Sequence, residues 1–149
     1  NYINCGGIQI SEDIGRDKLQ NIRQQTDKQI IKTVVVTKEG GRKMLIEYQD
    51  YCDFILLDTR FGGYTGGTGV TNDWNLCREI IKNSKKPVYL AGGLNPENLL
   101  NAVKQTRPAG VDVSTGISEY CETYLRKDRK SRDKIDRFIR IAKSYGTKK

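Results

Sequence analysis

Three glycine-rich loops in the second half of the chain constrain its fold more than any other feature. Each loop accompanies a short apolar run that fits a buried strand. The loops span residues 58–69, 91–98 and 110–116, and the apolar runs span residues 54–57, 88–90 and 111–113. A repeated order of buried strand, glycine turn and amphipathic helix is typical of a parallel α/β sheet or barrel. Such folds bind ligands where strands end and loops begin, so the loops predict the position of a site before its ligand is known.

The hydrophobic pattern extends this order along the chain. We expect strands at residues 8–10, 30–36, 54–58, 88–91 and 110–113, and helices at residues 15–25, at 40–51 and after residues 73, 95 and 131. Asp73, Asn95 and Ser131 are the predicted N-caps of the last three helices. The predicted inward faces of the last two helices are Leu99, Leu100 and Val103, and then Ile135, Phe138, Ile139 and Ala142. The pattern predicts five strands and five helices in alternation, in one domain that spans residues 1–149.

Composition fits one compact domain. Hydrophobic residues make up 36% of the 149 residues, and no apolar run approaches the roughly 18 residues that a membrane span needs. The first residues show neither the basic nor the apolar region of a signal peptide. The four cysteines are scattered and histidine is absent, so a zinc site would need all four thiolates and we expect no metal. This cysteine usage favours a reducing cytoplasm.

The net charge of +8 is concentrated near the C-terminus. Residues 119–149 hold eleven Lys or Arg and five Asp or Glu. One interpretation is a face that binds a polyanion. The other is a solvated final helix whose basic end suits the helix dipole. We favour the second and expect neither a nucleic-acid nor a membrane partner, because no aromatic–basic nucleic-acid motif accompanies the charge.

The last two loops predict a phosphate site. Gly92 and Gly93 follow one expected strand, and Ser114, Thr115 and Gly116 follow the next. Glycine lets backbone N–H groups approach an anion closely, and clustered N–H groups bind phosphate without a Lys or Arg. In a (β/α)8 barrel, the last two βα loops commonly form this site. The alternative is that these glycines only make tight turns.

Two aspartates stand at predicted strand ends. Asp58 closes an apolar run, and its apolar neighbours should raise its pKa, as a general acid requires near neutral pH. Alternatively, its carboxylate accepts N–H bonds from the following turn. Asp112 lies between Val111 and Val113 and should face away from them. It either orients the substrate or forms an ion pair with Lys32, and the residues alone leave both possibilities open.

Five sequence blocks together resemble phosphoribosylanthranilate isomerase, a (β/α)8-barrel family of tryptophan biosynthesis. They are Leu-Leu-Asp-Thr at 56–59, Gly-Gly-Thr-Gly at 66–69, Asp-Trp at 73–74, Ala-Gly-Gly-Leu-Asn-Pro-Glu-Asn at 91–98 and Gly-Val-Asp-Val-Ser-Thr-Gly at 110–116. Residues 7–10 resemble the family's fourth strand and residues 30–33 its fifth. The resemblance therefore implies an incomplete TIM barrel of about five βα units.

The resemblance also implies a reaction. The family converts N-(5′-phosphoribosyl)anthranilate into 1-(2-carboxyphenylamino)-1-deoxyribulose 5-phosphate by an Amadori rearrangement, without a metal or an organic cofactor. By resemblance, Asp58 is the general acid and Asp112 contacts the phosphorylated substrate. The residues implied to bind or cover that substrate are Gly67, Thr68, Gly69, Gly92, Gly93, Ser114, Thr115 and Gly116.

The chain departs from the family pattern at several points. The family's general base is a cysteine on the first strand, and Cys5 imitates its surroundings. Too few residues separate Cys5 from Asp58 for the intervening βα units, so we expect Cys5 not to be the base. Ser11 stands where the family often has His, and Val70 where it has Lys. A segment or second chain would have to supply the missing strands; alternatively, the chain is a non-catalytic, sugar-phosphate-binding half barrel.

Overall fold

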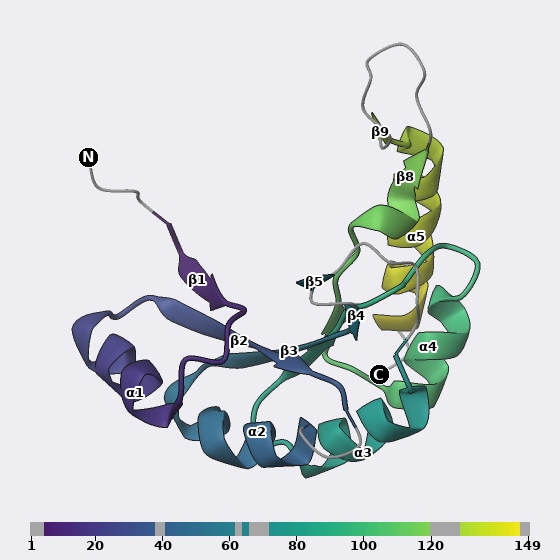
Figure 1. Cartoon of the computed structure of the whole chain (residues 1–149). Helices are drawn as coiled ribbons and strands as arrows, with labels where there is room; N and C mark the ends of the chain where they lie inside the picture. The colour runs from purple at the N-terminus through teal and green to yellow at the C-terminus, as the bar shows by residue number, and fades with distance from the viewer. Residues whose placement is uncertain (1–4, 38–40, 62–63, 66–71, 120–128, 147–149) are drawn as a thin grey trace.

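A five-stranded parallel sheet organises the chain (Figure 1). The structure is a computed structural model, and it describes residues 5–37, 41–61, 64–65, 72–119 and 129–146. The strands follow the order β1, β2, β3, β6, β7, with bounds Gly7–Ile10, Gln29–Val35, Phe54–Asp58, Val88–Leu90 and Gly110–Val111. All four neighbouring pairs are parallel. The predicted class, a parallel α/β fold, is confirmed.

A helix follows each strand of the sheet in the chain, and the helices cover one face of the curved sheet (Figure 1). They are α1 Arg16–Gln25, α2 Gly41–Tyr48, α3 Trp74–Asn83, α4 Leu99–Thr106 and α5 Arg132–Gly146, with short 3-10 turns η1 Gln49–Tyr51 and η2 Thr115–Ile117. Two small antiparallel pairs were not predicted: β4 Arg60–Phe61 with β5 Tyr64–Thr65, and β8 Ser118–Glu119 with β9 Arg129–Lys130.

Strand alternation separates the two faces of the sheet. Ile55 and Leu57 of β3 belong to the buried core between the sheet and the helices. Phe54, Leu56 and Asp58 therefore point to the opposite, concave face. There the ring of Phe54 stacks on Tyr89 of β6, with ring centroids 5.3 Å apart. Because Asp58 ends β3 on this face, its carboxylate lies away from the helix layer.

The predicted elements match the structure where local chemistry defines them. The predicted strand at residues 54–58 coincides with β3. The Asp73 side chain caps α3 by accepting from the N–H groups of Asn75 and Leu76. The Asn95 side chain instead caps a turn, accepting from Glu97 and Asn98, so α4 begins only at Leu99.

Two predicted inward residues are wrong. Leu100 is 41% exposed and Ile139 is 44% exposed. On α5, the residues that pack on the core include Phe138, Ile141 and Ala142. The buried apolar stripe of α5 is therefore rotated by part of a turn from the predicted stripe. The cause is tertiary: α4 packs against both α3 and α5, and these contacts set the orientation of each helix. The last strand is also shorter than predicted and ends at Val111.

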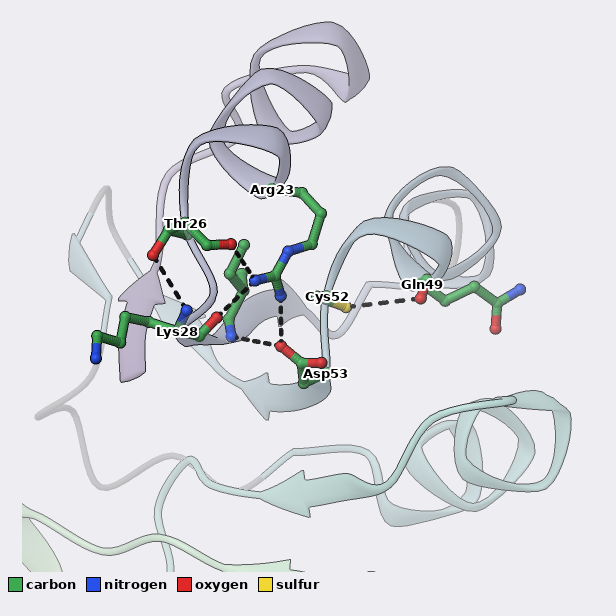
Figure 2. A network of polar contacts seen from close by, with 7 residues as sticks. Arg23, Thr26, Lys28, Gln49, Cys52 and Asp53 are labelled. Atoms are coloured by element: carbon green, nitrogen blue, oxygen red, sulfur yellow. Dashed lines mark hydrogen bonds and ion pairs between the residues drawn. The ribbon is translucent and has the colours of Figure 1, made fainter. Parts of the chain in front are cut away.

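A polar network closes the amino edge of the sheet (Figure 2). The Arg23 guanidinium on α1 donates to Asp53 Oδ2 at 2.8 Å and to the carbonyl oxygens of Thr26 and Lys28 at 2.6 and 2.8 Å. Asp53 Oδ2 also accepts from the N–H of Ile30 at 2.8 Å. The network ties α1 to the starts of β2 and β3. It lies at the edge that serves stability in parallel β/α folds.

Leu57 should be among the residues on which stability depends most, because it is fully buried at the centre of the sheet. We expect Leu57→Ala to lower the free energy of unfolding by about 2 to 5 kcal/mol through lost burial and the cavity it leaves. Urea unfolding followed by circular dichroism measures this value. The matched control is Leu100→Ala on the exposed side of α4, which should change stability by about 0.5 kcal/mol or less. Equal effects of the two substitutions would contradict the core described here.

Candidate functional site

A small pocket lies where β3, β6 and β7 end, and we call it the carboxyl-edge pocket. Its volume is about 50 Å³, and it is lined by Asp58, Ala91, Gly92, Gly93, Leu94, Asp112, Val113, Ser114 and Thr115. Six of these residues are predicted site residues: Asp58, Gly92, Gly93, Asp112, Ser114 and Thr115. The register of the parallel ladder brings them together, since Leu57 pairs with Leu90 and Leu90 with Val111.

Asp58 has the electrostatic environment that the sequence predicts. Burial raises the pKa of its carboxyl group above the ordinary value, and the nearby charge of Asp112 raises it further. The N–H of Thr59 donates to Asp58 Oδ1 at 2.8 Å and lowers the pKa in part. The predicted direction of the shift is confirmed, and the alternative contact with the following turn is present as well. Asp58 is therefore a half-buried carboxyl group that holds its proton to higher pH than a free aspartate.

Two glycines allow the loops around the pocket to touch. A Cβ atom on Gly116 would lie 1.8 Å from the carbonyl oxygen of Leu94, so the third loop packs directly against the second. Gly92 has a φ of +82°, and its Cβ would lie 2.9 Å from the backbone nitrogen of Thr59. Side chains at these two positions would push the loops apart or impose strain. These two positions thus require glycine because neighbouring backbone lies too close for a side chain, and not only because the chain turns there.

The loops that form the pocket contain several backbone N–H groups with no acceptor among the described residues. Among the hydrogen bonds of the described residues, none is donated by the N–H of Gly92, Gly93, Ser114, Thr115 or Gly116. A buried or half-buried N–H without a partner costs free energy unless water or a ligand accepts from it. A cluster of such groups suits an anion.

Side chains that the sequence analysis missed hold the neighbouring carbonyl groups. Asn72 Nδ2 donates to Ala91 O at 2.8 Å, Asn98 Nδ2 to Gly93 O at 2.9 Å, and Lys130 Nζ to Ser114 O at 2.7 Å. In a trans peptide, the C=O of one residue and the N–H of the next point in opposite directions. Asn72 precedes the Asp-Trp block at 73–74 and Asn98 ends the block at 91–98, so their positions in the sequence could have indicated a role in the site. Lys130 carried no local signal, because it lies 16 residues beyond Ser114 in a charged stretch.

Asp112 and Lys32 occupy different surroundings. Lys32 is fully buried, and its Nζ donates to the carbonyl oxygens of Ile10, Glu12 and Thr33 at 3.4, 3.0 and 2.7 Å. It also lies 5.0 Å from the ring centroid of Tyr48. Asp112 lines the carboxyl-edge pocket beside Asp58, and β3 and β6 separate its strand from β2. Asp112 therefore lies in the pocket with Asp58 and not on a strand adjacent to that of Lys32, and its predicted role in orienting a substrate stays a prediction.

The other predicted site residues and the cysteines do not line the carboxyl-edge pocket among the described residues. Gly67, Thr68 and Gly69 lie outside the described residues. Gly116 supports the pocket through Leu94 instead of lining it. Cys5 precedes β1 and so lies near the amino edge, opposite the carboxyl-edge pocket. Cys52 and Cys77 are buried, and burial raises their pKa values to about 11 and about 12.

The described residues contain neither a cluster of metal ligands nor a membrane-spanning helix. No group of three or more His, Cys, Asp or Glu side chains that could hold a metal ion occurs among them. None of their helices is long and apolar enough to cross a membrane. A larger, mainly apolar pocket of about 370 Å³ lies beside the start of β7 and the end of α5, and it shares no lining residue with the carboxyl-edge pocket.

The fold and the pocket define an α/β protein that matches TIM-barrel-like structures. The family model described as N-(5'phosphoribosyl)anthranilate (PRA) isomerase matches residues 7–139. The chain therefore belongs to the phosphoribosylanthranilate isomerase family.

Individual relatives agree with this assignment. The chain is 35% identical to N-(5'-phosphoribosyl)anthranilate isomerase of Methanosarcina acetivorans, over 81% of this chain and 55% of that protein. It is 32% identical to the isomerase of Methanothrix thermoacetophila, over 96% of this chain and 64% of that protein. The chain thus spans little more than half to just under two thirds of the length of these relatives.

Solved structures show the same relationship. Phosphoribosyl anthranilate isomerase from Thermotoga maritima matches with a TM-score of 0.74 and 32% identity, over 93% of this chain and 62% of that one. A phosphoribosyl anthranilate isomerase in complex with reduced 1-(o-carboxyphenylamino)-1-deoxyribulose 5-phosphate matches with a TM-score of 0.69 and 28% identity, over 93% of this chain and 60% of that one.

Asp112 should contribute to the raised pKa of Asp58. We expect Asp112→Asn to lower the Asp58 pKa, because the variant removes a neighbouring negative charge that favours the protonated form. The pKa should stay above its ordinary value, since burial is the larger cause. A carbon-13 NMR titration of the Asp58 carboxyl carbon measures both values. Asp50→Asn, which removes an exposed charge in η1, before the start of β3, is the control and should leave the titration unchanged.

Proposed function

We propose that this chain forms the phosphate-binding and general-acid part of a phosphoribosylanthranilate isomerase. The reaction is the Amadori rearrangement of N-(5′-phosphoribosyl)anthranilate to 1-(2-carboxyphenylamino)-1-deoxyribulose 5-phosphate, a step of tryptophan biosynthesis. One observation carries the proposal: a carboxyl group with a raised pKa lines the same pocket as Gly92, Gly93, Ser114 and Thr115, whose backbone N–H groups have no acceptor among the described residues. Family membership independently supports the same reaction.

Asp58 is the proposed general acid. In its protonated form it donates to the ribose ring oxygen as the bond from that oxygen to C1′ breaks, and the anthranilate nitrogen forms the Schiff base. A general base then removes the C2′ proton, and the resulting enolamine tautomerises to the ketone. The raised pKa of Asp58 favours the protonated form that the first step needs.

The glycine loops are the proposed phosphate cradle. Donors from Gly92, Gly93, Ser114, Thr115 and Gly116 would bind the phosphate, and residues 67–69 would cover the substrate. Pockets for whole drug-sized ligands measure roughly 300 to 1,000 Å³, whereas this pocket measures about 50 Å³. It therefore suits one compact group, with the sugar extending toward Asp58 and Asp112. Anchoring the phosphate holds the sugar in a reactive position.

The proposed protein is a cytoplasmic enzyme without a metal or organic cofactor. Residues 1–149 form a single partial (β/α)8 barrel domain of about five βα units in this proposal. Strands β1 and β7 are the edges of the described sheet, and each has one partner there. The proposed partner is a segment or chain that supplies the other strands and the general base.

A second candidate function is sugar-phosphate binding without turnover. It is favoured by the position of Cys5 near the amino edge of the sheet, away from the carboxyl-edge pocket. The ionisable residues that line this pocket are Asp58 and Asp112. The two candidates share the phosphate cradle and differ in whether a base completes the site.

Gly116→Ala should weaken phosphate binding by about tenfold or more, a loss of about 1.4 kcal/mol. The added methyl group would meet the Leu94 carbonyl oxygen at 1.8 Å, so one of the two loops must move. Isothermal titration of the purified chain with inorganic phosphate measures the affinity. The control is Gly6→Ala, where an added methyl group meets nothing within 4 Å. Unchanged affinity in Gly116→Ala would argue against a cradle built from these loops.

Asp58→Ala should separate catalysis from phosphate binding. The test joins this chain to the N-terminal βα units of the Methanothrix thermoacetophila relative and follows conversion of N-(5′-phosphoribosyl)anthranilate by chromatography. We expect the variant to lose at least about 100-fold in rate, because general acids contribute about 10²–10⁴-fold. Its affinity for inorganic phosphate should change little.

The outcomes distinguish the candidates. Loss of both rate and phosphate affinity would make Asp58 a structural residue. A joined protein with wild-type Asp58 that binds phosphate without turnover would favour the non-catalytic candidate.

A further inference from the structure

Lys130 connects the β8–β9 hairpin to the carboxyl-edge pocket. Its Nζ donates to Ser114 O at 2.7 Å and to Ser118 Oγ at 3.0 Å, and it lies 3.5 Å from Ser114 Oγ. Ser114 itself lines the pocket. Lys130 belongs to β9, which pairs with β8, so the hairpin holds its ammonium group over the third glycine loop.

We propose that Lys130 is a cationic clamp of the carboxyl-edge pocket, which holds the Ser114 carbonyl outward and adds a positive charge for a bound phosphate. This inference rests on the proposed phosphate binding. Its first part follows from peptide geometry: a donor on the Ser114 carbonyl orients the N–H of Thr115 in the opposite direction. That N–H donates to no acceptor among the described residues.

The second part follows from the charges around the pocket. Asp58 and Asp112 line it, and a carboxylate at either position repels a phosphate. Backbone N–H groups contribute partial charges only, as do the amide donors Asn72 and Asn98 on the other two loop carbonyls. The ammonium of Lys130 occupies the equivalent position on the third loop with a full positive charge. It thereby offsets part of the acidic character of the site.

The neighbouring Lys134 makes a different contact. Its Nζ donates to Ser118 O at 2.7 Å and therefore connects α5 to β8. The contact does not involve a residue that lines the pocket. The side chain of Lys130 is exposed, so its replacement leaves the buried core intact. This makes Lys130 accessible to substitution without loss of the fold.

The test is titration of the purified chain with inorganic phosphate at several salt concentrations. We expect Lys130→Met to weaken binding about two- to fivefold, the range of an exposed charge pair, and to make affinity less dependent on salt. Lys130→Arg should restore most of the affinity, because it keeps the charge and the donors. The matched control is Lys104→Met, an equal change of charge at an exposed position on α4.

Each outcome decides the proposal. Equal phosphate affinity and equal salt dependence in Lys130→Met and Lys104→Met would overturn it, while leaving the phosphate cradle in place. Failure of Lys130→Arg to rescue binding would overturn the charge contribution. A wild-type chain that binds no phosphate would overturn both this inference and the cradle on which it rests. Thermal unfolding of each variant establishes that the fold is retained.

Discussion

The parallel hydrogen-bond ladder through β3, β6 and β7 is the constraint on which the site depends. It continues past the strand ends, where the N–H of Ala91 donates to Leu57 O at 2.7 Å and that of Asp112 donates to Leu90 O at 2.9 Å. These bonds bring Asp58, the Gly92 loop and the Ser114 loop to one edge. A slip of one residue in β3 would turn Asp58 toward the helix layer, because successive side chains point to opposite faces.

The polar groups at the two edges of the sheet differ in how far internal hydrogen bonds satisfy them. At the amino edge, the Arg23 guanidinium satisfies a carboxylate and two carbonyl groups at once. At the carboxyl edge, Asn72, Asn98 and Lys130 donate to loop carbonyls. Among the described residues, the N–H groups of Gly92, Gly93, Ser114, Thr115 and Gly116 have no acceptor. One edge is closed by internal contacts, whereas the other retains donors for a ligand. This division matches the general separation of stability and function in parallel β/α folds.

Much of this arrangement could be predicted from local sequence chemistry. The apolar run that ends in Asp58 predicted β3, and Asp73 predicted the cap of α3, because alternation and capping act within a few residues. The predicted orientation of Leu100 was wrong because packing against other helices selects which side of α4 is buried. The burial of Lys32 also required tertiary contacts, since carbonyl groups of β1 and the following loop accept from its ammonium group.

By itself, the sequence determined the order of strands, glycine loops and helices, and the place of a carboxyl group at the end of one strand. These features depend on residue size, backbone freedom and short-range periodicity. Only the tertiary structure decided that Gly116 would pack on Leu94 and that Lys130 would reach Ser114. Such contacts depend on strand register and on the docking of a hairpin far along the chain, so no local pattern of residues encodes them.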